Sequence, residues 1–472
     1  MYLHELQSII NGNLFGDAIF DGIATHPDEV RAGNLFVCLE GKRHDGHEAA
    51  IEAVQRGASC VVGNRLVATD APQMVVADTR SALSRIAAHY YGVDVADLVL
   101  VGVTGTNGKT SVAYMLQRVF ATAGLAAAYI GTLGVVADKL LLPPTLTTPD
   151  PQQLMPLLAS LAERGVKYVF LEVSAHAAYW RKVAGLRFKA MVFTNLTQDH
   201  LDFFADMSEY ANAKMQLFDL AYTSLGVINA DDDWGQKILQ ARRIPLLSYG
   251  LDNPADVFAV NVRDEREGLR FVVNAYDMVL PIEADLHGRF NVYNVLAVAA
   301  VAGYLGVSPT FVCQALQHLS VPGRFNVVDV GEVRFVVDYA HTPDGLRNAI
   351  EAARTQTKGK LTVVFGCGGD RDKDKRHLMG RIASQLADYV YITNDNPRSE
   401  SPASIIAGIE AGIEIDQNYS VILDRESAIR EAYRTSGAGD CVLIAGKGAE
   451  TTIEIGGAKV PYSDFDVLER LK

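Results

Sequence analysis

The sequence lacks the features that place a protein in a membrane, outside the cell or on nucleic acid. No apolar run approaches the roughly 20 residues of a membrane-spanning helix. The start, MYLHELQSII, has no basic segment followed by an apolar one, so no secretory signal is predicted. Lysine and arginine number 43 against 56 aspartates and glutamates, and the net charge of −13 argues against nucleic acid as a partner. We expect a cytoplasmic, monomeric protein that acts on small molecules, without membrane insertion.

Cysteine is scarce, with five residues in 472. They are scattered and form neither a Cys-x-x-Cys pair nor a Cys/His spacing typical of a metal site. Reduced, buried thiols in a cytoplasmic protein are therefore expected. The five are Cys38, Cys60, Cys313, Cys367 and Cys441.

What the sequence does have is short apolar segments that alternate with helical stretches, the pattern of parallel α/β domains. A chain of 472 residues exceeds the size of a single hydrophobic core, so we expect three domains, with two as the alternative. The changes in pattern divide it into residues 1–95, 96–321 and 322–472. In the last of these, four apolar segments each end in polar or glycine residues. Ligands gather outside the carboxyl ends of strands in open α/β sheets, so chemistry is expected there.

A glycine-rich loop follows the apolar segment at the start of the second domain, in VLVGVTGTNGKTS. Its glycines let backbone N–H groups close on phosphate oxygens, and the following helix adds its positive end. Lys109 supplies a charge for terminal phosphates, and Thr110 supplies a hydroxyl ligand for Mg²⁺. Val103 stands where the usual pattern has its first glycine. The predicted ATP-binding residues of the loop are Gly105, Thr106, Asn107, Gly108, Lys109, Thr110 and Ser111. The loop alone is compatible with a kinase, a motor-type NTPase or a ligase.

Further motifs decide between these classes when they are taken in order along the chain. They are TGTNGKTS, LEVSAH, TNLTQDHLD, YANAKMQLF, HGRFNVYN, VPGRF and VDYAHTPD. As an ordered set they resemble the Mur ligase family, whose members build the peptide of bacterial cell-wall precursors. FGCGGDRDKDKRHLMG, DNPR and GKGAE are similar to the MurE branch of that family.

The resemblance implies three α/β domains: an N-terminal domain for the UDP-sugar substrate, a central ATP-binding domain with a P-loop and a parallel sheet, and a C-terminal Rossmann-like domain that binds the amino acid. It also implies a reaction that uses ATP and Mg²⁺. ATP phosphorylates a carboxylate, an amine attacks the acyl phosphate, and ADP and phosphate leave. In the MurE branch the amine is meso-diaminopimelate and the acyl substrate is UDP-N-acetylmuramoyl-L-alanyl-D-glutamate.

The family also implies roles for single residues of the central domain. Glu172, at the end of an apolar segment, and His200 correspond to metal ligands. Lys214 corresponds to a lysine that carbon dioxide converts into an anionic carbamate near the second Mg²⁺. With Lys109, these three form the predicted catalytic set.

Other family positions hold the nucleotide and the two substrates. Asn291 and Asn294 correspond to positions near the nucleotide base, and Arg324 and Asp338 to positions that hold ATP when the last domain closes; His341 ranks below them. The predicted acyl-substrate residues are Thr147, Thr148, Ser174 and Lys182. The predicted amino-acid contacts are Arg371, Asp395, Asn396, Pro397, Arg398, Gly446 and Glu450.

Arg398 has the strongest chemical reason for its place in the amino-acid set. A guanidinium grips a carboxylate with two parallel hydrogen bonds. Diaminopimelate carries one carboxylate more than lysine, and lysine-adding relatives lack this arginine. Glu450 suits the distal ammonium. Ala449 replaces the usual histidine of GKGAE, a minor departure.

The acyl-substrate side departs further from the family. His26-Pro27-Asp28 stands where members have Asp-Ser-Arg, and Ala175, Trp180 and Lys182 replace serine, glutamine and arginine. Two interpretations stay open: a ligase with re-made UDP-sugar contacts, or a MurE-like ligase of a specialised pathway that acts on another acyl substrate. A third, a non-catalytic binding protein with this fold, is disfavoured by the intact catalytic set. A kinase would leave DNPR and GKGAE without a role.

Overall fold

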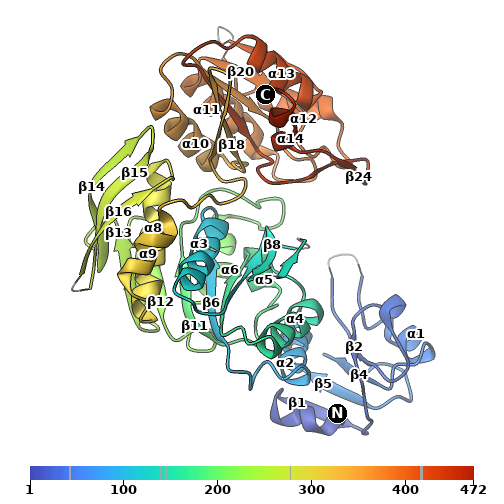
Figure 1. The fold of residues 1–472 in the computed structure, drawn as a ribbon. Helices are drawn as coiled ribbons and strands as arrows, with labels where there is room; N and C mark the ends of the chain where they lie inside the picture. The colour runs from blue at the N-terminus through green and yellow to red at the C-terminus, as the bar shows by residue number, and fades with distance from the viewer. Residues whose placement is uncertain (42–43, 139, 144–145, 277, 415–417) are drawn as a thin grey trace. The chain divides into compact units, whose positions relative to one another are not determined.

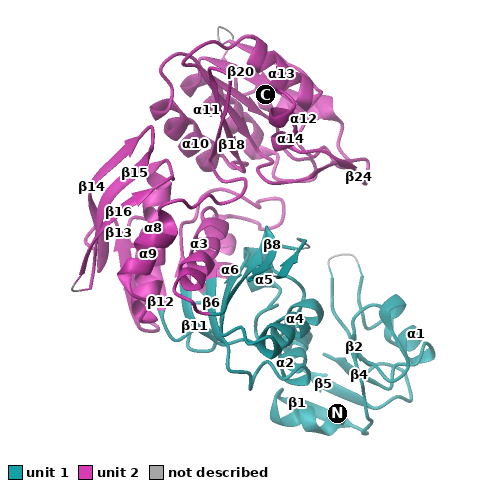
Figure 2. Cartoon of the chain, in the orientation of Figure 1, with its two compact units in different colours: residues 1–102, 126–191, 216–225 teal, residues 103–125, 192–215, 226–472 magenta. Residues whose placement is uncertain are grey.

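The computed structural model describes residues 1–41, 44–138, 140–143, 146–276, 278–414 and 418–472. Contacts between Cα atoms divide the chain into two compact units, coloured in Figure 2. Unit 1 comprises residues 1–102, 126–191 and 216–225, and unit 2 comprises residues 103–125, 192–215 and 226–472. The chain passes between the units within β6 (Val99–Thr104) and β11 (Phe188–Phe193).

Unit 1 begins with a small mixed sheet of strand order β1-β5-β4-β3-β2, as predicted for the N-terminal region. β1 runs antiparallel to β5, and the remaining pairs are parallel. An apolar core that includes Leu35, Val62 and Ile86 lies between the sheet and α2. Asp78 caps α2 by accepting hydrogen bonds from the first-turn N–H groups of Arg80 and Ser81. The elements are η1 (Leu3–Ser8), β1 (Gly12–Phe15), β2 (Ile23–Ala24), η2 (Pro27–Glu29), β3 (Leu35–Val37), α1 (Ala50–Gln55), β4 (Cys60–Gly63), β5 (Gln73–Val76) and α2 (Thr79–Tyr90).

The second part of unit 1 is built on strands in the order β10-β7-β8-β9. β10 and β7 are parallel and fully apolar along most of their length, as expected for strands covered on both faces. Proline at the first position of α4 starts that helix, where its missing N–H costs nothing. The elements are β7 (Ala127–Gly131), β8 (Gly134–Ala137), β9 (Leu140–Leu142), α4 (Pro151–Glu163), β10 (Tyr168–Glu172) and α5 (Ala175–Tyr179).

The first part of unit 2 combines parallel strands with an antiparallel extension in the order β16-β15-β14-β13-β12. β12, β13 and β14 pair in parallel, whereas β14, β15 and β16 form an antiparallel meander, with α8 and α9 beside these strands in Figure 1. The elements are α3 (Lys109–Thr122), α6 (Met207–Met215), β12 (Gly226–Asn229), α7 (Asp233–Ala241), β13 (Leu246–Gly250), β14 (Val257–Glu265), β15 (Gly268–Ala275), β16 (Met278–Ala284), α8 (Arg289–Tyr304) and α9 (Pro309–Leu316).

The second part of unit 2 is a six-stranded sheet of order β17-β18-β22-β19-β20-β21. All its pairs are parallel except β17 with β18, and apolar clusters lie on both faces of the sheet. The four predicted strands of this region are β18, β22, β19 and β20, and they form its centre. The elements are β17 (Asn326–Val330), β18 (Val333–Asp338), α10 (Pro343–Thr355), β19 (Leu361–Phe365), α11 (Asp374–Leu386), β20 (Tyr389–Ile392), α12 (Pro402–Glu410), β21 (Tyr419–Val421), α13 (Arg425–Arg434), β22 (Cys441–Ala445), β23 (Thr452–Ile455), β24 (Ala458–Pro461) and α14 (Asp464–Glu469).

The structure therefore confirms the predicted α/β class, with parallel strands at the centre of each large sheet. Among the described residues, no helix is long and apolar enough to cross a membrane. The domain boundaries near residues 95 and 321 stay predictions. Four of the five cysteines are buried, Cys313 is partly buried, and all are free thiols.

Candidate active site

The glycine loop of unit 2 connects β6 to α3 as predicted. Gly105 and Gly108 have φ values of 150° and 86°, which side chains rarely adopt. A Cβ atom on Gly105 would overlap Thr194 Oγ1, and one on Gly108 would lie 2.7 Å from Asn294 Oδ1. Both positions therefore require glycine for backbone geometry and for space, as a loop that closes on phosphate does.

The glycine loop leads directly into the first turn of α3. Gly108 is the N-cap residue of this helix and, as a glycine, forms no side-chain capping hydrogen bond. The Lys109 Nζ atom donates to the carbonyl oxygens of Gly105 at 2.9 Å and Thr106 at 2.7 Å, which holds its charge over the loop. This backbone and charge suit a nucleotide phosphate.

The rest of the loop is fastened to neighbouring segments of unit 2. The Asn107 backbone N–H donates to Asn195 Oδ1 at 2.9 Å, and the Thr106 hydroxyl lies 3.0 Å from the Tyr210 hydroxyl. Ser111 is buried in the first turn of α3. These bonds fix the loop before any ligand binds.

Lys214 lies in α6, directly against the same loop. Its side chain is 1% exposed, and its Nζ donates to the Gly105 carbonyl at 2.8 Å. Burial, and then the charge of Lys109, hold the pKa of the Lys214 ammonium well below its usual value. The neutral amine is thereby favoured, and a neutral amine is the form that reacts with carbon dioxide.

His200 has an acidic partner in the preceding residue. It adopts φ +58°, and its Nε2 lies 3.3 Å from Asp199 Oδ2. Asp199 is buried and also lies 3.6 Å from the Lys375 Nζ and 3.8 Å from the His341 Nε2. His341, His200 and Lys375 together hold the pKa of the Asp199 carboxyl well below its usual value despite its burial. The Asp199 carboxylate thus orients the ring of His200 and also lies close to His341 and Lys375 in the last third of the chain.

Glu172 ends β10 in unit 1, as predicted, and is fully buried. Its carboxylate accepts hydrogen bonds from the Tyr129 hydroxyl at 2.5 Å and the Thr132 backbone N–H at 2.9 Å. A Cβ atom on Gly131 would overlap its Oε1. A buried carboxylate oxygen held this way suits a hard cation such as Mg²⁺.

The predicted acyl-substrate residues lie around Glu172 in unit 1. The Thr148 hydroxyl donates to the Glu172 carbonyl at 2.8 Å and accepts from the Ser174 backbone N–H at 3.0 Å. The Thr147 hydroxyl lies 3.2 Å from that of Thr132. Lys182 forms an ion pair with Asp150 at 2.8 Å. The structure brings these four predicted residues into one region of unit 1.

Asn291 and Asn294 lie in the first two turns of α8 and are buried. The Asn294 amide donates to Asn291 Oδ1 at 2.9 Å, and the Asn291 amide donates to the His287 carbonyl at 2.8 Å. Since Asn294 also lies next to Gly108, this chain of amides places a polar surface beside the glycine loop.

Arg324 and Asp338 connect the loop to the last third of the chain within unit 2. The Arg324 Nη2 donates to the Thr110 hydroxyl at 2.9 Å, and its guanidinium carbon lies 4.2 Å from the centre of the Tyr339 ring. Asp338 accepts backbone N–H bonds from Phe325 and Ala340, both at 2.7 Å. Burial raises the pKa of the Asp338 carboxyl. Asp338 thus holds the turn at Phe325, and the neighbouring Arg324 contacts Thr110 at the start of α3.

A second connection joins the loop to α10. The Asn107 Nδ2 donates to Asp344 Oδ2 at 3.0 Å, and the Thr342 hydroxyl lies 3.4 Å from Asn107 Oδ1. Burial raises the pKa of the Asp344 carboxyl. Asp344 was not among the predicted site residues.

The predicted amino-acid contacts gather at the carboxyl ends of β20 and β22. The Asn396 amide donates to Glu450 Oε2 at 2.9 Å, and the fully buried Lys447 donates to the same oxygen at 2.7 Å. Asp395 is buried, and a Cβ atom on Gly446 would lie 2.5 Å from its Oδ2. Glu450 therefore already forms an ion pair with one ammonium group, that of Lys447.

Arg398 follows Pro397 in a left-handed conformation, with φ +50°. Its Nη1 donates to the Gly369 carbonyl at 2.7 Å, and its Nε lies 3.4 Å from Glu454 Oε2. Arg371 is exposed and donates to the Asp370 carbonyl at 3.1 Å. Both arginines border Gly368, Arg398 with its guanidinium and Arg371 with its Cγ atom.

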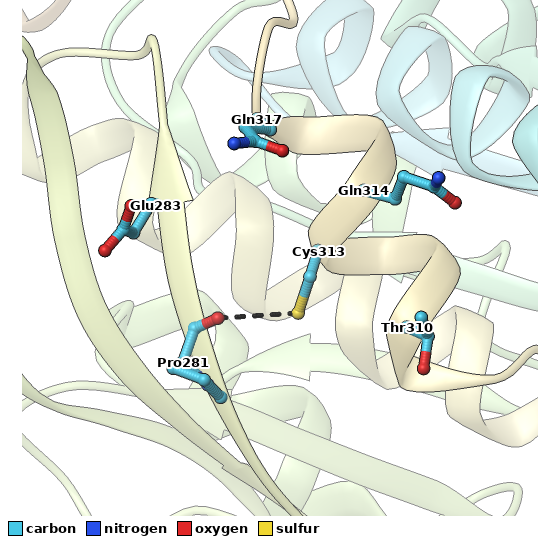
Figure 3. Close-up of a pocket in the computed structure, with 6 residues that line it drawn as sticks. All are labelled: Pro281, Glu283, Thr310, Cys313, Gln314 and Gln317. Atoms are coloured by element: carbon cyan, nitrogen blue, oxygen red, sulfur yellow. Dashed lines mark hydrogen bonds between the residues drawn. The ribbon is translucent and has the colours of Figure 1, made fainter.

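A separate groove of about 340 Å³ lies between β16 and α9 (Figure 3). The Cys313 thiol donates to the Pro281 carbonyl at 3.4 Å, and burial raises the pKa of this thiol. Glu283 is the one charged residue in its lining, and none of the predicted site residues lies there. The lining residues are Pro281, Glu283, Thr310, Cys313, Gln314 and Gln317.

Sequence reasoning did not identify four polar residues that the structure places at these sites: Asp199, Asp344, Lys375 and Lys447. All four lie inside the quoted motifs. Asp199, Lys375 and Lys447 are buried and Asp344 is partly buried, and the sequence does not reveal this burial.

Comparison with known proteins agrees with this arrangement along the chain. Residues 20–91 match "Mur ligase family, catalytic domain", residues 103–302 match "Mur ligase middle domain", and residues 323–448 match "Mur ligase, glutamate ligase domain". Together these three matches cover most of the sequence.

Similar proteins and solved structures carry related names. A UDP-N-acetylmuramoyl-L-alanyl-D-glutamate–2,6-diaminopimelate ligase of Caldanaerobacter subterraneus subsp. tengcongensis is 39% identical over 477 residues, covering 100% of this chain and 99% of the relative. The ligase of the same name from Syntrophomonas wolfei subsp. wolfei is 41% identical, covering 92% and 91%. A solved structure of a ligase of that name has a TM-score of 0.70 at 31% identity, covering 96% and 94%. MurF of Thermotoga maritima in complex with ADP shares the fold, with a TM-score of 0.63 at 21% identity, covering 91% and 94%. This chain belongs to the Mur ligase family and is an ATP-dependent ligase.

Proposed function

We propose that this ligase adds meso-diaminopimelate to UDP-N-acetylmuramoyl-L-alanyl-D-glutamate in the cytoplasm, a step of peptidoglycan precursor synthesis. ATP and Mg²⁺ are required, and ADP and phosphate are released. The observation that carries the proposal is the Arg398 guanidinium beside the turn at Gly368, which the aliphatic part of the Arg371 side chain also borders. The names of relatives 39% and 41% identical to this chain include the same amino acid and the same acyl substrate.

The proposed division of labour follows the predicted domains. Residues 1–95 bind the UDP-sugar, residues 96–321 bind ATP, and residues 322–472 bind the amino acid. We propose that the chain works as a monomer.

Activation of the acyl substrate begins at the glycine loop. The backbone from Gly105 to Ser111 holds the phosphates of ATP, with Lys109 at the terminal phosphate and Asn291 and Asn294 at the base. Arg324 and Asp338 hold the nucleotide from the last third of the chain. The substrate carboxylate attacks the terminal phosphorus, the bond to ADP breaks, and an acyl phosphate forms.

The residues Thr110, Glu172, His200 and Lys214 would hold Mg²⁺. The donor set fits: a hydroxyl, a buried carboxylate, an oriented imidazole and a lysine whose neutral amine is favoured. Carbon dioxide would convert Lys214 into a carbamate, an anion that balances cationic charge. When bound, Mg²⁺ reduces the repulsion between the phosphate and the substrate carboxylate. Glu172 and the chain around Thr147, Thr148, Ser174 and Lys182 orient that carboxylate.

The amine then attacks the acyl carbon, and phosphate leaves from the tetrahedral intermediate. Arg398, with Arg371, grips the distal carboxylate of diaminopimelate in a planar fork. The distal ammonium and carboxylate of the amino acid are bound by Glu450, Asp395 and Asn396. The backbone at Gly446 and Pro397 borders the same site. Each role uses the charge or hydrogen-bonding capacity that the side chain presents at the carboxyl ends of β20 and β22.

One observation supports a second candidate function. In the segment His26-Pro27-Asp28, His26 is the N-cap of the 3₁₀ helix η2, Pro27 is buried in that helix, and Asp28 pairs with Arg56 at 2.7 Å. Proline offers neither a hydroxyl nor a backbone donor to a uridine. A MurE-like ligase of a specialised pathway, with another acyl substrate, would explain this segment.

A coupled assay of phosphate release decides between the two functions. UDP-N-acetylmuramoyl-L-alanyl-D-glutamate is supplied with ATP, Mg²⁺ and either meso-diaminopimelate or lysine. We expect turnover with diaminopimelate that exceeds turnover with lysine by about 100-fold, the value of one charge-assisted contact of roughly 2.7 kcal/mol. Absence of turnover with both amino acids would contradict the proposal and favour the specialised ligase.

A further inference from the structure

One arginine of unit 1 is held rigidly without a carboxylate partner. Arg80 lies in the first turn of α2, and its guanidinium carbon is 3.8 Å from the ring centre of Trp180. Its Nη2 donates to the Glu40 carbonyl at 2.5 Å. The guanidinium is therefore held from two directions, by an aromatic face and by a backbone oxygen. Both Arg80 and Trp180 keep part of their surface exposed.

The neighbouring cations form direct ion pairs, whereas Arg80 forms none with the described residues and has Asp78, Asp150 and Glu40 only at longer range. Arg181 pairs with Asp78 at 3.0 Å, and Lys182 pairs with Asp150 at 2.8 Å. Within the described residues, no carboxylate oxygen lies within 4.0 Å of a guanidinium nitrogen of Arg80. Burial lowers the pKa of this guanidinium, since partial desolvation disfavours its charge. An anionic ligand would supply the missing counter-charge.

The position of the pair indicates which part of a substrate it would meet. The Ser84 hydroxyl, on the same helix as Arg80, donates to the Lys182 carbonyl at 2.8 Å and accepts from the Gly185 backbone N–H at 2.9 Å. These bonds hold α2 against the segment that contains Lys182, a proposed substrate contact. Along the chain, α5 lies between Glu172 and Trp180, so Trp180 follows the proposed metal ligand by one short helix.

We propose that Arg80, held in place by Trp180, binds the diphosphate of the nucleotide-linked acyl substrate. The proposal rests on the proposed function, because that function supplies a substrate with a diphosphate remote from its reacting carboxylate. A guanidinium offers parallel N–H groups that match two phosphate oxygens. Trp180 replaces the family's glutamine, so its indole provides a flat surface in place of a hydrogen-bonding group.

The test measures steady-state constants of the full-length enzyme with UDP-N-acetylmuramoyl-L-alanyl-D-glutamate, ATP and diaminopimelate. Arg80→Ala should raise the KM for the UDP-linked substrate about 100-fold, the loss expected for a charge-assisted phosphate contact. The kcat and the KM values for ATP and diaminopimelate should change less than about 3-fold, since Arg80 touches neither. Trp180→Gln should raise the same KM by about 5-fold, the value of a partly desolvated cation–π contact, and Trp180→Phe should raise it less.

Arg85→Ala is the matched control, because Arg85 is an exposed arginine of the same helix. A second substrate, N-acetylmuramoyl-L-alanyl-D-glutamate without the nucleotide diphosphate, should be used equally by wild type and Arg80→Ala. Equal KM values for Arg80→Ala and Arg85→Ala with the UDP-linked substrate would overturn the inference while leaving the proposed function intact. A loss of thermal stability with all three KM values raised would assign Arg80 a structural role instead. No turnover of the UDP-linked substrate by the wild type would overturn the proposed function and this inference with it.

Discussion

The two substrate sides of this ligase differ in how closely they keep the family's residues. The amino-acid side in unit 2 keeps Arg371, Asn396, Arg398 and Glu450, and the structure gathers them at the carboxyl ends of parallel strands. The acyl side in unit 1 has lost two serines, a glutamine and two arginines of the family pattern, and Lys182, which replaces one of those arginines, pairs with Asp150. The predicted catalytic residues Lys109, Glu172, His200 and Lys214 keep the residue types of the family. We therefore propose that the choice of amino acid and the choice of acyl substrate depend on different parts of this chain.

The largest expected effect on kcat comes from Lys214, a predicted catalytic residue that is needed whichever amino acid is used. Lys214→Ala should lower kcat by on the order of 10³, as for loss of a group that stabilises charge in the transition state. A short carboxylic acid added to the assay should restore part of the activity, because it replaces the carbamate. Lys459→Ala, an exposed lysine in β24, is the control.

Wild-type activity of Lys214→Ala would remove the carbamate from the mechanism. A loss that differs between diaminopimelate and lysine would instead assign Lys214 to the amino-acid side, contrary to its contact with Gly105.

The next effect should be confined to the amino-acid side. Arg398→Ala should lower kcat/KM for diaminopimelate by about 100-fold, through loss of a contact worth roughly 2.7 kcal/mol, while the KM for ATP stays within about 2-fold. Arg381→Ala, an exposed arginine of α11, serves as the control. Equal losses for ATP and diaminopimelate would show that Arg398 does not select the amino acid.

The structure also adds information that motifs could not supply. The motifs placed the glycine loop, Glu172 at a strand end and Arg398 after β20, because each depends on local sequence. The contact between Asn107 and Asp344 spans 237 positions, and that between Gln198 and Asp372 spans 174, so spacing along the chain carries no sign of them.

The antiparallel meander β14–β16 was also not predicted from the sequence. Its strands alternate between buried and exposed residues, whereas the predicted strands are continuous apolar runs. Continuous runs mark strands covered on both faces, and partly exposed strands give a weaker signal.

A smaller effect on the amino-acid side tests backbone geometry. Gly446 has φ +112°, and a Cβ atom there would lie 2.5 Å from Asp395 Oδ2. Gly446→Ala should therefore lower kcat/KM for diaminopimelate by about 10-fold, since a strained residue costs about 1–3 kcal/mol. Gly437→Ala is the control, because no atom lies within 4 Å of a Cβ built at Gly437. Unchanged kinetics for Gly446→Ala would exclude this glycine from the site.

The smallest expected effect lies on the acyl side and is a gain. Lys182→Arg restores the planar fork that the family usually has at this position. Its gain is limited because Asp150 already pairs with the cation at 2.8 Å, and because Lys182 is close to the Thr148 carbonyl at 3.5 Å. We expect the KM for UDP-N-acetylmuramoyl-L-alanyl-D-glutamate to fall by about 2- to 5-fold, equivalent to roughly 0.4–1 kcal/mol, with the KM for diaminopimelate unchanged. Lys189→Arg, an exposed lysine in β11, controls for the substitution itself. A rise in the KM for the UDP-linked substrate would mean that the acyl side has adapted to lysine, and the difference between the two sides would then reflect a different acyl substrate.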